Sequence, residues 1–247
     1  MTEKKANRDR IYASPIDQVE AFAFDDSVAE VFDDMIRRSV PGYAMTLSLM
    51  PLITRRYAQP GSTVYDLGCS LGAGMAAIVD SLPPGVSLIG VDNSDPMLER
   101  CRANTERSFQ GKKWSLLCDD ILNTNIEDAS VVILNFTLQF IEPAKRLSLL
   151  QRIAEGLRPG GALLLSEKIR FEDENAQRDL TELHHEFKKV NGYSELEVSQ
   201  KRTSLENVLI PETISNHKSR LERAGFDHSE TWLQCFNFAS LLAVKPS

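Results

Sequence analysis

Polar side chains recur where successive predicted strands end, and their types suit a nucleotide ligand. Asp92 follows the apolar run VSLIGV, Asp120 follows WSLLCD, and Asn135 ends ASVVILN. Because parallel strands end at one edge of a sheet, we expect these side chains to face one crevice. Asp92 could accept hydrogen bonds from both hydroxyls of a ribose, and Asp120 could accept from an adenine amine beside the Ile121 backbone.

A glycine-rich loop, YDLGCSLGAG at residues 65–74, follows the first predicted strand and opens a helix. A dinucleotide fingerprint would place glycine at 68, 70 and 73, whereas the chain has Gly68, Ser70 and Ala73, so a pyrophosphate site fits poorly. The alternative is a turn that only lets the helix pack on the sheet. Each carboxylate taken singly is also more often a helix cap or a solvated turn residue. Their order at successive strand ends favours a ligand site.

Short apolar runs alternate with helical patterns from residue 61 to 170 and again from 210 to 247. This alternation is typical of an α/β fold with a doubly wound, mostly parallel sheet. The final runs, 229–235 and 238–245, lie close enough to form a hairpin, which would leave the last strand antiparallel to its neighbours. We therefore predict a single domain over residues 1–247.

Two helical additions interrupt this alternation. Residues 25–60 predict an N-terminal elaboration of two helices, separated by Pro41-Gly42, with Pro51 bending or starting the second helix. Residues 171–209 form a polar, helical insertion. Its place in the chain predicts a lid over the carboxyl ends of the strands.

Composition and charge narrow the function classes. The net charge of −7 and pI near 5.2 disfavour an extended phosphate-binding surface, so direct nucleic-acid binding is not expected. The N-terminal segment has no apolar signal core and no run is long enough to span a bilayer, which predicts a cytoplasmic protein without membrane association. The four cysteines and four histidines lack metal-ligand spacing, so no metal is expected.

The D-x-G loop, the acidic strand ends and LRPGG at residues 157–161 resemble the class I S-adenosylmethionine-dependent methyltransferase family. This resemblance implies a seven-stranded Rossmann-like sheet with an antiparallel C-terminal hairpin, and S-adenosylmethionine as the ligand. Residues 135–140 read NFTLQF in place of the (D/N)-PP-(Y/F) motif, so an amino-methylating nucleic-acid enzyme is not supported.

A closer resemblance is to the carboxy-S-adenosylmethionine synthase family, from about residue 11 to the end. It is carried by SVPGY, DLGCSLGA, NFTLQF, LSEK, NGYSELEVSQKR and QCFNF. The resemblance implies a homodimer that converts prephenate to phenylpyruvate and carbon dioxide, while the sulfonium methyl loses a proton and the resulting ylide captures the carbon dioxide. The product, carboxy-S-adenosylmethionine, would supply a second enzyme, a tRNA carboxymethyltransferase acting on wobble uridine.

The resemblance also assigns ligand-binding residues. They are Tyr43, Gly68, Cys69, Ser70, Asp92, Asn93, Asp120, Ile121, Asn135 and Arg202. Arg202 is the implied catalytic residue, because its guanidinium offers a planar fork for the new carboxylate that Lys201 could match only as a point charge. The alternative reading makes Lys201-Arg202 an exposed pair facing Glu197 or Glu206 at helical spacing.

Two other functions remain open from the sequence. An ordinary methyltransferase acting on a small carboxylic acid would use the same pocket without needing Arg202. A non-catalytic protein that binds the carboxylated ligand and presents it to a partner enzyme would not turn over prephenate.

Overall fold

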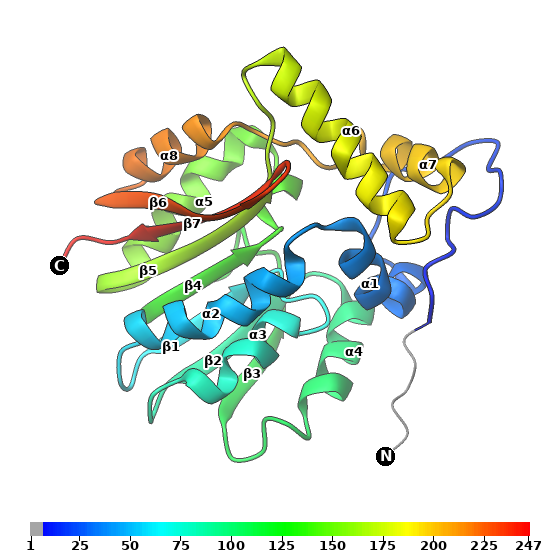
Figure 1. Cartoon of the computed structure of the whole chain (residues 1–247). Coiled ribbons are helices and arrows are strands. Elements are labelled where there is room, and N and C mark those ends of the chain that lie inside the picture. Colours follow the sequence, from blue (N-terminus) through cyan, green and yellow to red (C-terminus); the bar gives the residue numbers. More distant parts are fainter. Residues whose placement is uncertain (1–6) are drawn as a thin grey trace.

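The computed structural model describes residues 7–247, whose centre is a seven-stranded sheet with helices on both faces (Figure 1). The strands are β1 (Thr63–Leu67), β2 (Ser87–Asp92), β3 (Lys113–Cys118), β4 (Ala129–Asn135), β5 (Leu157–Lys168), β6 (His228–Cys235) and β7 (Phe238–Val244). The helices are α1 (Asp26–Ser39), α2 (Tyr43–Tyr57), α3 (Ala73–Ile78), α4 (Asp95–Thr105), α5 (Pro143–Gly156), α6 (Glu174–Val190), α7 (Glu195–Leu205) and α8 (Ile214–Arg223).

The strand order is β3-β2-β1-β4-β5-β7-β6, and the chain reverses direction only at β7. β1 to β5 pair in parallel, whereas β7 runs antiparallel to both β5 and β6. The predicted fold class is confirmed, including the antiparallel last strand. The central strand β4 is buried on both faces up to Asn135, as expected of a parallel strand covered by helices.

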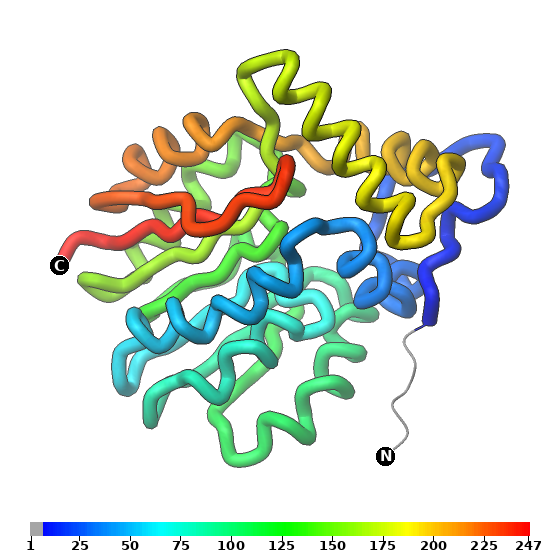
Figure 2. Tube along the Cα trace, viewed as in Figure 1, coloured from blue at the N-terminus to red at the C-terminus, as the bar shows by residue number. Residues whose placement is uncertain are grey.

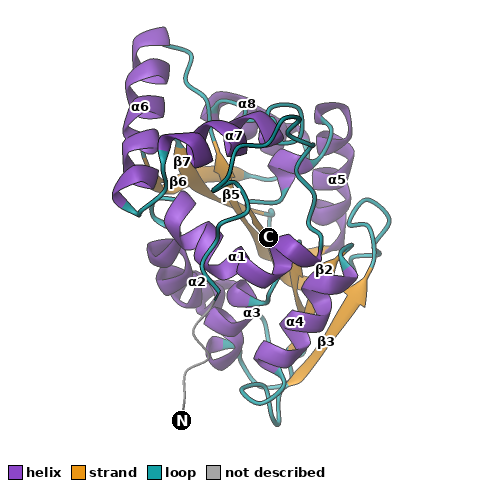
Figure 3. Cartoon of the chain, turned by 90° about the vertical axis from the view of Figure 1, so that its right-hand side faces the viewer, coloured by secondary structure: helices purple, strands orange, loops and turns teal. Residues whose placement is uncertain are grey.

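Helices lie on both faces of the sheet (Figure 3), and an apolar layer on each face holds them there. On one face, α2, α3 and α4 pack through Met50, Met75 and Cys101. On the other face, α5 and α8 pack through Leu149 and Leu221. The connection from β3 to β4 contains only turns, so within the described residues this crossover carries no helix.

Two local expectations need correction. Pro51 does not start the second helix, because α2 begins at Tyr43 and continues through Pro51 to Tyr57, with Met50 and Thr54 fully buried. The Arg-Pro-Gly-Gly sequence at 158–161 predicts a break before the fifth strand, but β5 begins at Leu157 and includes these residues, with a register shift against β4. Gly160 takes a left-handed φ of +70° there, which absorbs this irregularity without a steric penalty.

The segment between β5 and α8 forms α6 and α7, which lie with α1 at one end of the sheet (Figure 1). Helix α7 begins with a capping box between Ser194 and Glu197. The side chain of Gln200 on α7 donates to the carbonyls of Tyr12 and Ser14, both at 2.9 Å, so the N-terminal segment runs beside this helix (Figure 2).

Among residues 7–247, no helix has the length and apolar character needed to cross a bilayer.

A buried arginine joins α5 to the chain that follows α7. Arg146 is fully buried, and its guanidinium donates to the carbonyls of Ile141 (2.8 Å), Gln139 (3.1 Å) and Ile210 (2.9 Å). It also pairs with Glu212, whose second oxygen accepts from Arg220 at 2.5 Å. Burial favours the neutral acid, but the hydrogen bonds from Arg220 and Arg146 outweigh it and lower the pKa of Glu212.

We expect Arg146→Met to lower the free energy of unfolding by about 3 kcal/mol, because it strands three carbonyls and breaks a buried ion pair. Urea unfolding followed by circular dichroism measures this change. The matched control is Lys145→Met, which removes an exposed pair with Glu142 and should change stability by less than about 0.5 kcal/mol. Equal effects of the two substitutions would contradict the structural role of Arg146.

Candidate functional site

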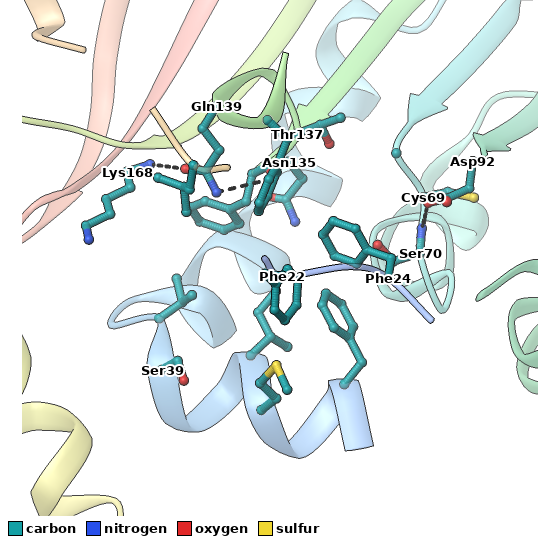
Figure 4. A pocket seen from close by; sticks show the side chains of 18 of the residues that line it. Phe22, Phe24, Ser39, Cys69, Ser70, Asp92, Asn135, Thr137, Gln139 and Lys168 are labelled. Atoms are coloured by element: carbon teal, nitrogen blue, oxygen red, sulfur yellow. Dashed lines mark hydrogen bonds between the residues drawn. The ribbon is translucent and has the colours of Figure 1, made fainter. Parts of the chain in front are cut away.

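A cavity of about 370 Å³ opens at the carboxyl ends of the strands and is lined in part by residues of α1, α6 and α7. Its size is within the usual range of small-molecule sites. Its walls come from the loop after β1, the end of β2, the turn at residues 119–121 and the segment at residues 135–141. Aromatic side chains, among them Phe22 and Phe24, face the interior (Figure 4).

The loop after β1 is fixed by its own backbone. The Gly68 and Cys69 amides donate to the Val91 carbonyl at 2.8 and 3.0 Å. Gly68 has a φ of +80°, and a Cβ there would collide with the Thr137 side chain, so only glycine fits this turn. Ser70 also has a positive φ, +47°, and its amide donates to Asp92 Oδ2 at 2.9 Å.

Two buried carboxyl groups lie beside this loop. Asp92 Oδ1 accepts from the Ser94 amide at 3.0 Å, and Asp92 is 8% exposed. Burial raises the pKa of Asp92, and burial together with the nearby Asp92 raises the pKa of Asp66 to about 7. Since both groups line the cavity, a cationic ligand there would stabilise their charged forms.

The next two strand ends present further polar groups to the cavity. Asp120 Oδ1 accepts from the Leu122 amide at 2.8 Å, and Ile121 beside it is buried. Asn135 ends β4, and its Oδ1 atom is buried without a hydrogen-bond partner among residues 7–247. A buried acceptor of this kind normally has a donor, so a ligand that donates here would complete the site.

Gln139 joins the chain after β4 to the end of β5 at the cavity wall. Its main-chain amide donates to the buried carboxyl of Glu167 at 2.8 Å. Glu167 also accepts from the main-chain amide of Leu138 at 3.0 Å. The Gln139 side chain accepts from the Lys168 amide at 2.8 Å and donates to the Phe136 carbonyl at 3.3 Å (Figure 4). Burial raises the pKa of Glu167 to about 8.

The structure brings together nine of the ten residues predicted to bind a ligand. Tyr43, Gly68, Cys69, Ser70, Asp92, Asn93, Asp120, Ile121 and Asn135 all line the cavity. Arg202 is exposed on α7 and is not among the lining residues. Adjacent residues of a helix point about 100° apart, and here Lys201 takes the inward position. The roles assigned to all ten remain predictions.

Three lysines that the sequence interpretation did not assign to the site line the cavity: Lys168, Lys188 and Lys201. Lys168 ends β5, so its place at a carboxyl strand end was a usable signal. Nothing in the amphipathic pattern of α6 distinguishes Lys188 from a surface lysine, so the sequence could not predict its place in the cavity. Lys201 Nζ lies 3.7 Å from the centroid of the Phe22 ring and 3.0 Å from Met35 Sδ. No ion pair involves any of the three within residues 7–247.

The same part of the chain contains no cluster of three or more His, Cys, Asp or Glu side chains arranged to hold a metal ion.

Burial disfavours the charged form of each cavity lysine. Lys188 is 8% exposed, and burial with the nearby Lys168 lowers its pKa from 10.5 to about 7. The pKa of Lys201 is also lowered to about 7, mainly by burial. Burial, with a further contribution from Arg202, lowers the pKa of Lys168.

The lowered pKa of Lys188 makes stability depend on pH. Between pH 7 and 10.5 the unfolded chain holds a proton that the folded protein has released, so the free energy of unfolding contributed by this group rises with pH. Below pH 7 the full cost of burying the ammonium group is present. We expect Lys188→Met to be more stable than the original protein there, by roughly 2 to 4 kcal/mol.

Chemical unfolding across this pH range measures that advantage, which should shrink as the pH approaches 10.5. Lys189→Met is the control, because Lys189 follows Lys188 on α6 but pairs with Glu186 at the surface. An advantage of Lys188→Met that does not change with pH would contradict the assigned cause.

Comparisons with known proteins agree with this geometry. A family model described as a methyltransferase domain matches residues 64–161. A putative O-methyltransferase from Nostoc punctiforme superposes with a TM-score of 0.66 at 18% identity, covering 89% of this chain and 59% of that one. A complex of the Haloferax volcanii Trm112 methyltransferase activator and a methyltransferase gives 0.62 at 17% identity, covering 90% and 97%. At such identities these structures establish the fold alone.

Curated relatives are much closer in sequence. A carboxy-S-adenosyl-L-methionine synthase from Aliivibrio fischeri is 54% identical over 241 residues, covering 97% of this chain and 100% of the relative. The enzyme of the same name from Marinobacter nauticus is 54% identical over 240 residues, covering 97% and 96%. The chain therefore belongs to the carboxy-S-adenosyl-L-methionine synthase family, a family of transferases with the class I methyltransferase fold.

Proposed function

We propose that this chain converts S-adenosylmethionine and prephenate to carboxy-S-adenosylmethionine and phenylpyruvate. The observation that carries the proposal is the 54% identity, over 97% of the chain, to proteins named for making the carboxylated product. Prephenate as the co-substrate comes from the motif resemblance described above. We also propose that the product supplies a separate tRNA carboxymethyltransferase.

The cavity supports this proposal because its polar groups match the parts of S-adenosylmethionine. Asp92 would accept from the ribose hydroxyls, and Asp120 with the Ile121 backbone would meet adenine. The unpaired Oδ1 atom of Asn135 would accept from the methionyl ammonium group. Asp66, whose pKa is raised, would gain a favourable interaction from the positive charges of the ligand.

The reaction itself needs few protein groups. Prephenate loses carbon dioxide and hydroxide as its ring becomes aromatic, the sulfonium methyl gives its proton to that hydroxide, and the methyl carbon bonds to carbon dioxide. The positive sulfur stabilises the carbanion, and the cavity must keep water from competing with carbon dioxide. The aromatic side chains of Phe22, Phe24 and Phe136 on the cavity wall support this exclusion.

We further propose that Arg202 binds the new carboxylate in a homodimer, reaching the cavity of a second copy. Two observations support this arrangement. Arg202 is exposed and does not line the cavity of its own chain. Helices α6 and α7 also expose the apolar side chains of Leu183, Val190 and Leu196, which an association of two chains could cover.

The direct test is mass spectrometry of the small molecules after purified protein is incubated with S-adenosylmethionine and prephenate. We expect a product heavier than S-adenosylmethionine by one carbon dioxide, together with phenylpyruvate. Unchanged prephenate with only S-adenosylmethionine bound would reject the synthase. A methylated small acid would favour an ordinary methyltransferase, and tight binding of carboxy-S-adenosylmethionine without turnover would favour a carrier protein.

Arg202→Ala should weaken binding of carboxy-S-adenosylmethionine by about 2 to 5 kcal/mol, because the buried carboxylate would lose its partner. Binding of S-adenosylmethionine, which lacks that group, should hardly change. Calorimetry with both ligands measures the difference. Arg178→Ala is the control, since Arg178 is an exposed arginine on α6. Equal losses for both ligands would be inconsistent with a carboxylate contact by Arg202.

A further inference from the structure

The cavity has acidic side chains at one end and basic side chains at the other. Asp92 lies at one side and Lys168 at the other (Figure 4). Lys188 shares the lysine end, since Lys168 and Lys188 lie close enough for Lys168 to lower the pKa of Lys188. The proposed cationic ligand accounts for the acidic end, whereas nothing described so far accounts for the two lysines.

The groups around Lys168 and Lys188 offer no counter-ion. From α6, His184 and His185 face them, and the pKa of each histidine is lowered, first by burial and then by these lysines. His184 is neutral, with its Nε2 atom bonded to the Ser39 carbonyl at 2.8 Å. The side chains that α7 contributes nearby, Lys201 and Arg202, are basic and supply no negative charge.

Two acids close to these lysines are committed to other partners. Asp9 and Glu197 line a smaller space beside Lys188 and Lys201. The Asp9 carboxylate accepts from the Tyr193 hydroxyl at 2.6 Å and from the Ile11 amide at 3.1 Å. Glu197 accepts from the Ser194 amide at 2.7 Å in the capping box. Neither acid forms an ion pair with a cavity lysine among residues 7–247.

A buried ammonium group without a counter-ion destabilises the folded protein. An anion that enters the cavity would remove this cost, and it would gain charge-assisted hydrogen bonds in a site of low dielectric. The two lysines therefore indicate a site for an anionic ligand.

We infer that Lys168 and Lys188 form the binding subsite for the carboxylate groups of the co-substrate, a small organic dicarboxylate. The inference rests on the proposed function and extends it, because it places the co-substrate at the end of the cavity opposite Asp92. The opposite charges at the two ends then determine where each reactant binds. The sulfonium compound lies toward Asp66 and Asp92, and the dicarboxylate lies toward the lysines. Lys201 stays outside the subsite, since Phe22 and Met35 hold its ammonium group.

The test is calorimetric titration of prephenate into protein saturated with S-adenosylhomocysteine, which has no sulfonium methyl and cannot react. Lys168→Met and Lys188→Met should each weaken prephenate binding by about 30-fold or more. Affinity for S-adenosylhomocysteine should stay within about twofold in both variants. Lys189→Met removes an equal charge from the surface of the same helix, and it should leave both affinities unchanged.

Proton uptake separates binding from a structural role. An anion beside Lys188 raises its lowered pKa, so prephenate binding just above pH 7 should take up a proton. Titrations in two buffers of different ionisation enthalpy measure this uptake. It should be smaller in Lys188→Met and unchanged in Lys189→Met.

The possible outcomes test the lysine subsite and the proposed function independently of each other. Loss of prephenate affinity in both lysine variants supports the subsite, whether or not the original protein makes the carboxylated product. Product formation by the original protein with unchanged prephenate affinity in the variants would overturn the subsite and leave the function intact. Absence of prephenate binding to the original protein would overturn the subsite, while the product assay decides the function separately.

Discussion

The cavity depends on how the chain is held at Gln139. The buried carboxyl of Glu167 fixes the Leu138 and Gln139 amides, so the segment after β4 is anchored to β5. The Gln139 carbonyl accepts from Arg146 on α5 and from the Ile210 amide of the chain after α7. One residue therefore sets the relative positions of two strand ends, a helix and the return from the helical insertion. In a low-dielectric interior such a network is rigid because every lost bond strands another group.

This rigid wall allows the cavity to hold unpaired charges of both signs. Asp66 and Asp92 are buried near one another, and so are the lysines. Each group therefore makes the folded protein less stable than it would be with a counter-ion beside that group. The packing of β4, β5 and the two helical layers supplies the stability that these groups reduce. A cavity of this kind is complementary to ligands that carry charges opposite to its own, which is the arrangement expected of a preorganised site.

Much of this could be predicted from the sequence, because it depends on local pattern. Asp92, Asp120 and Asn135 lie at strand ends, and the sheet brings such ends together whatever the detailed packing. Which side chain of α7 points into the cavity could not be predicted from the sequence. It depends on how α7 packs against α1 and the N-terminal segment. For that reason Lys201 lines the cavity and Arg202 does not. Lys188 was missed because a buried lysine on an amphipathic helix resembles a surface lysine in sequence.

The hydrogen bonds between α7 and the N-terminal segment have a consequence for the rate at which ligands exchange. Gln200 bonds Tyr12 and Ser14, its side-chain oxygen accepts from the Ile16 amide at 2.8 Å, and the Phe22 amide donates to the Ser204 carbonyl at 2.9 Å. Phe22 itself is part of the cavity wall. Opening the cavity on this side therefore breaks these bonds together, as one cooperative unit. Dissociation through this side then has the rate of a local unfolding event, which favours long occupancy by whatever ligand the cavity holds.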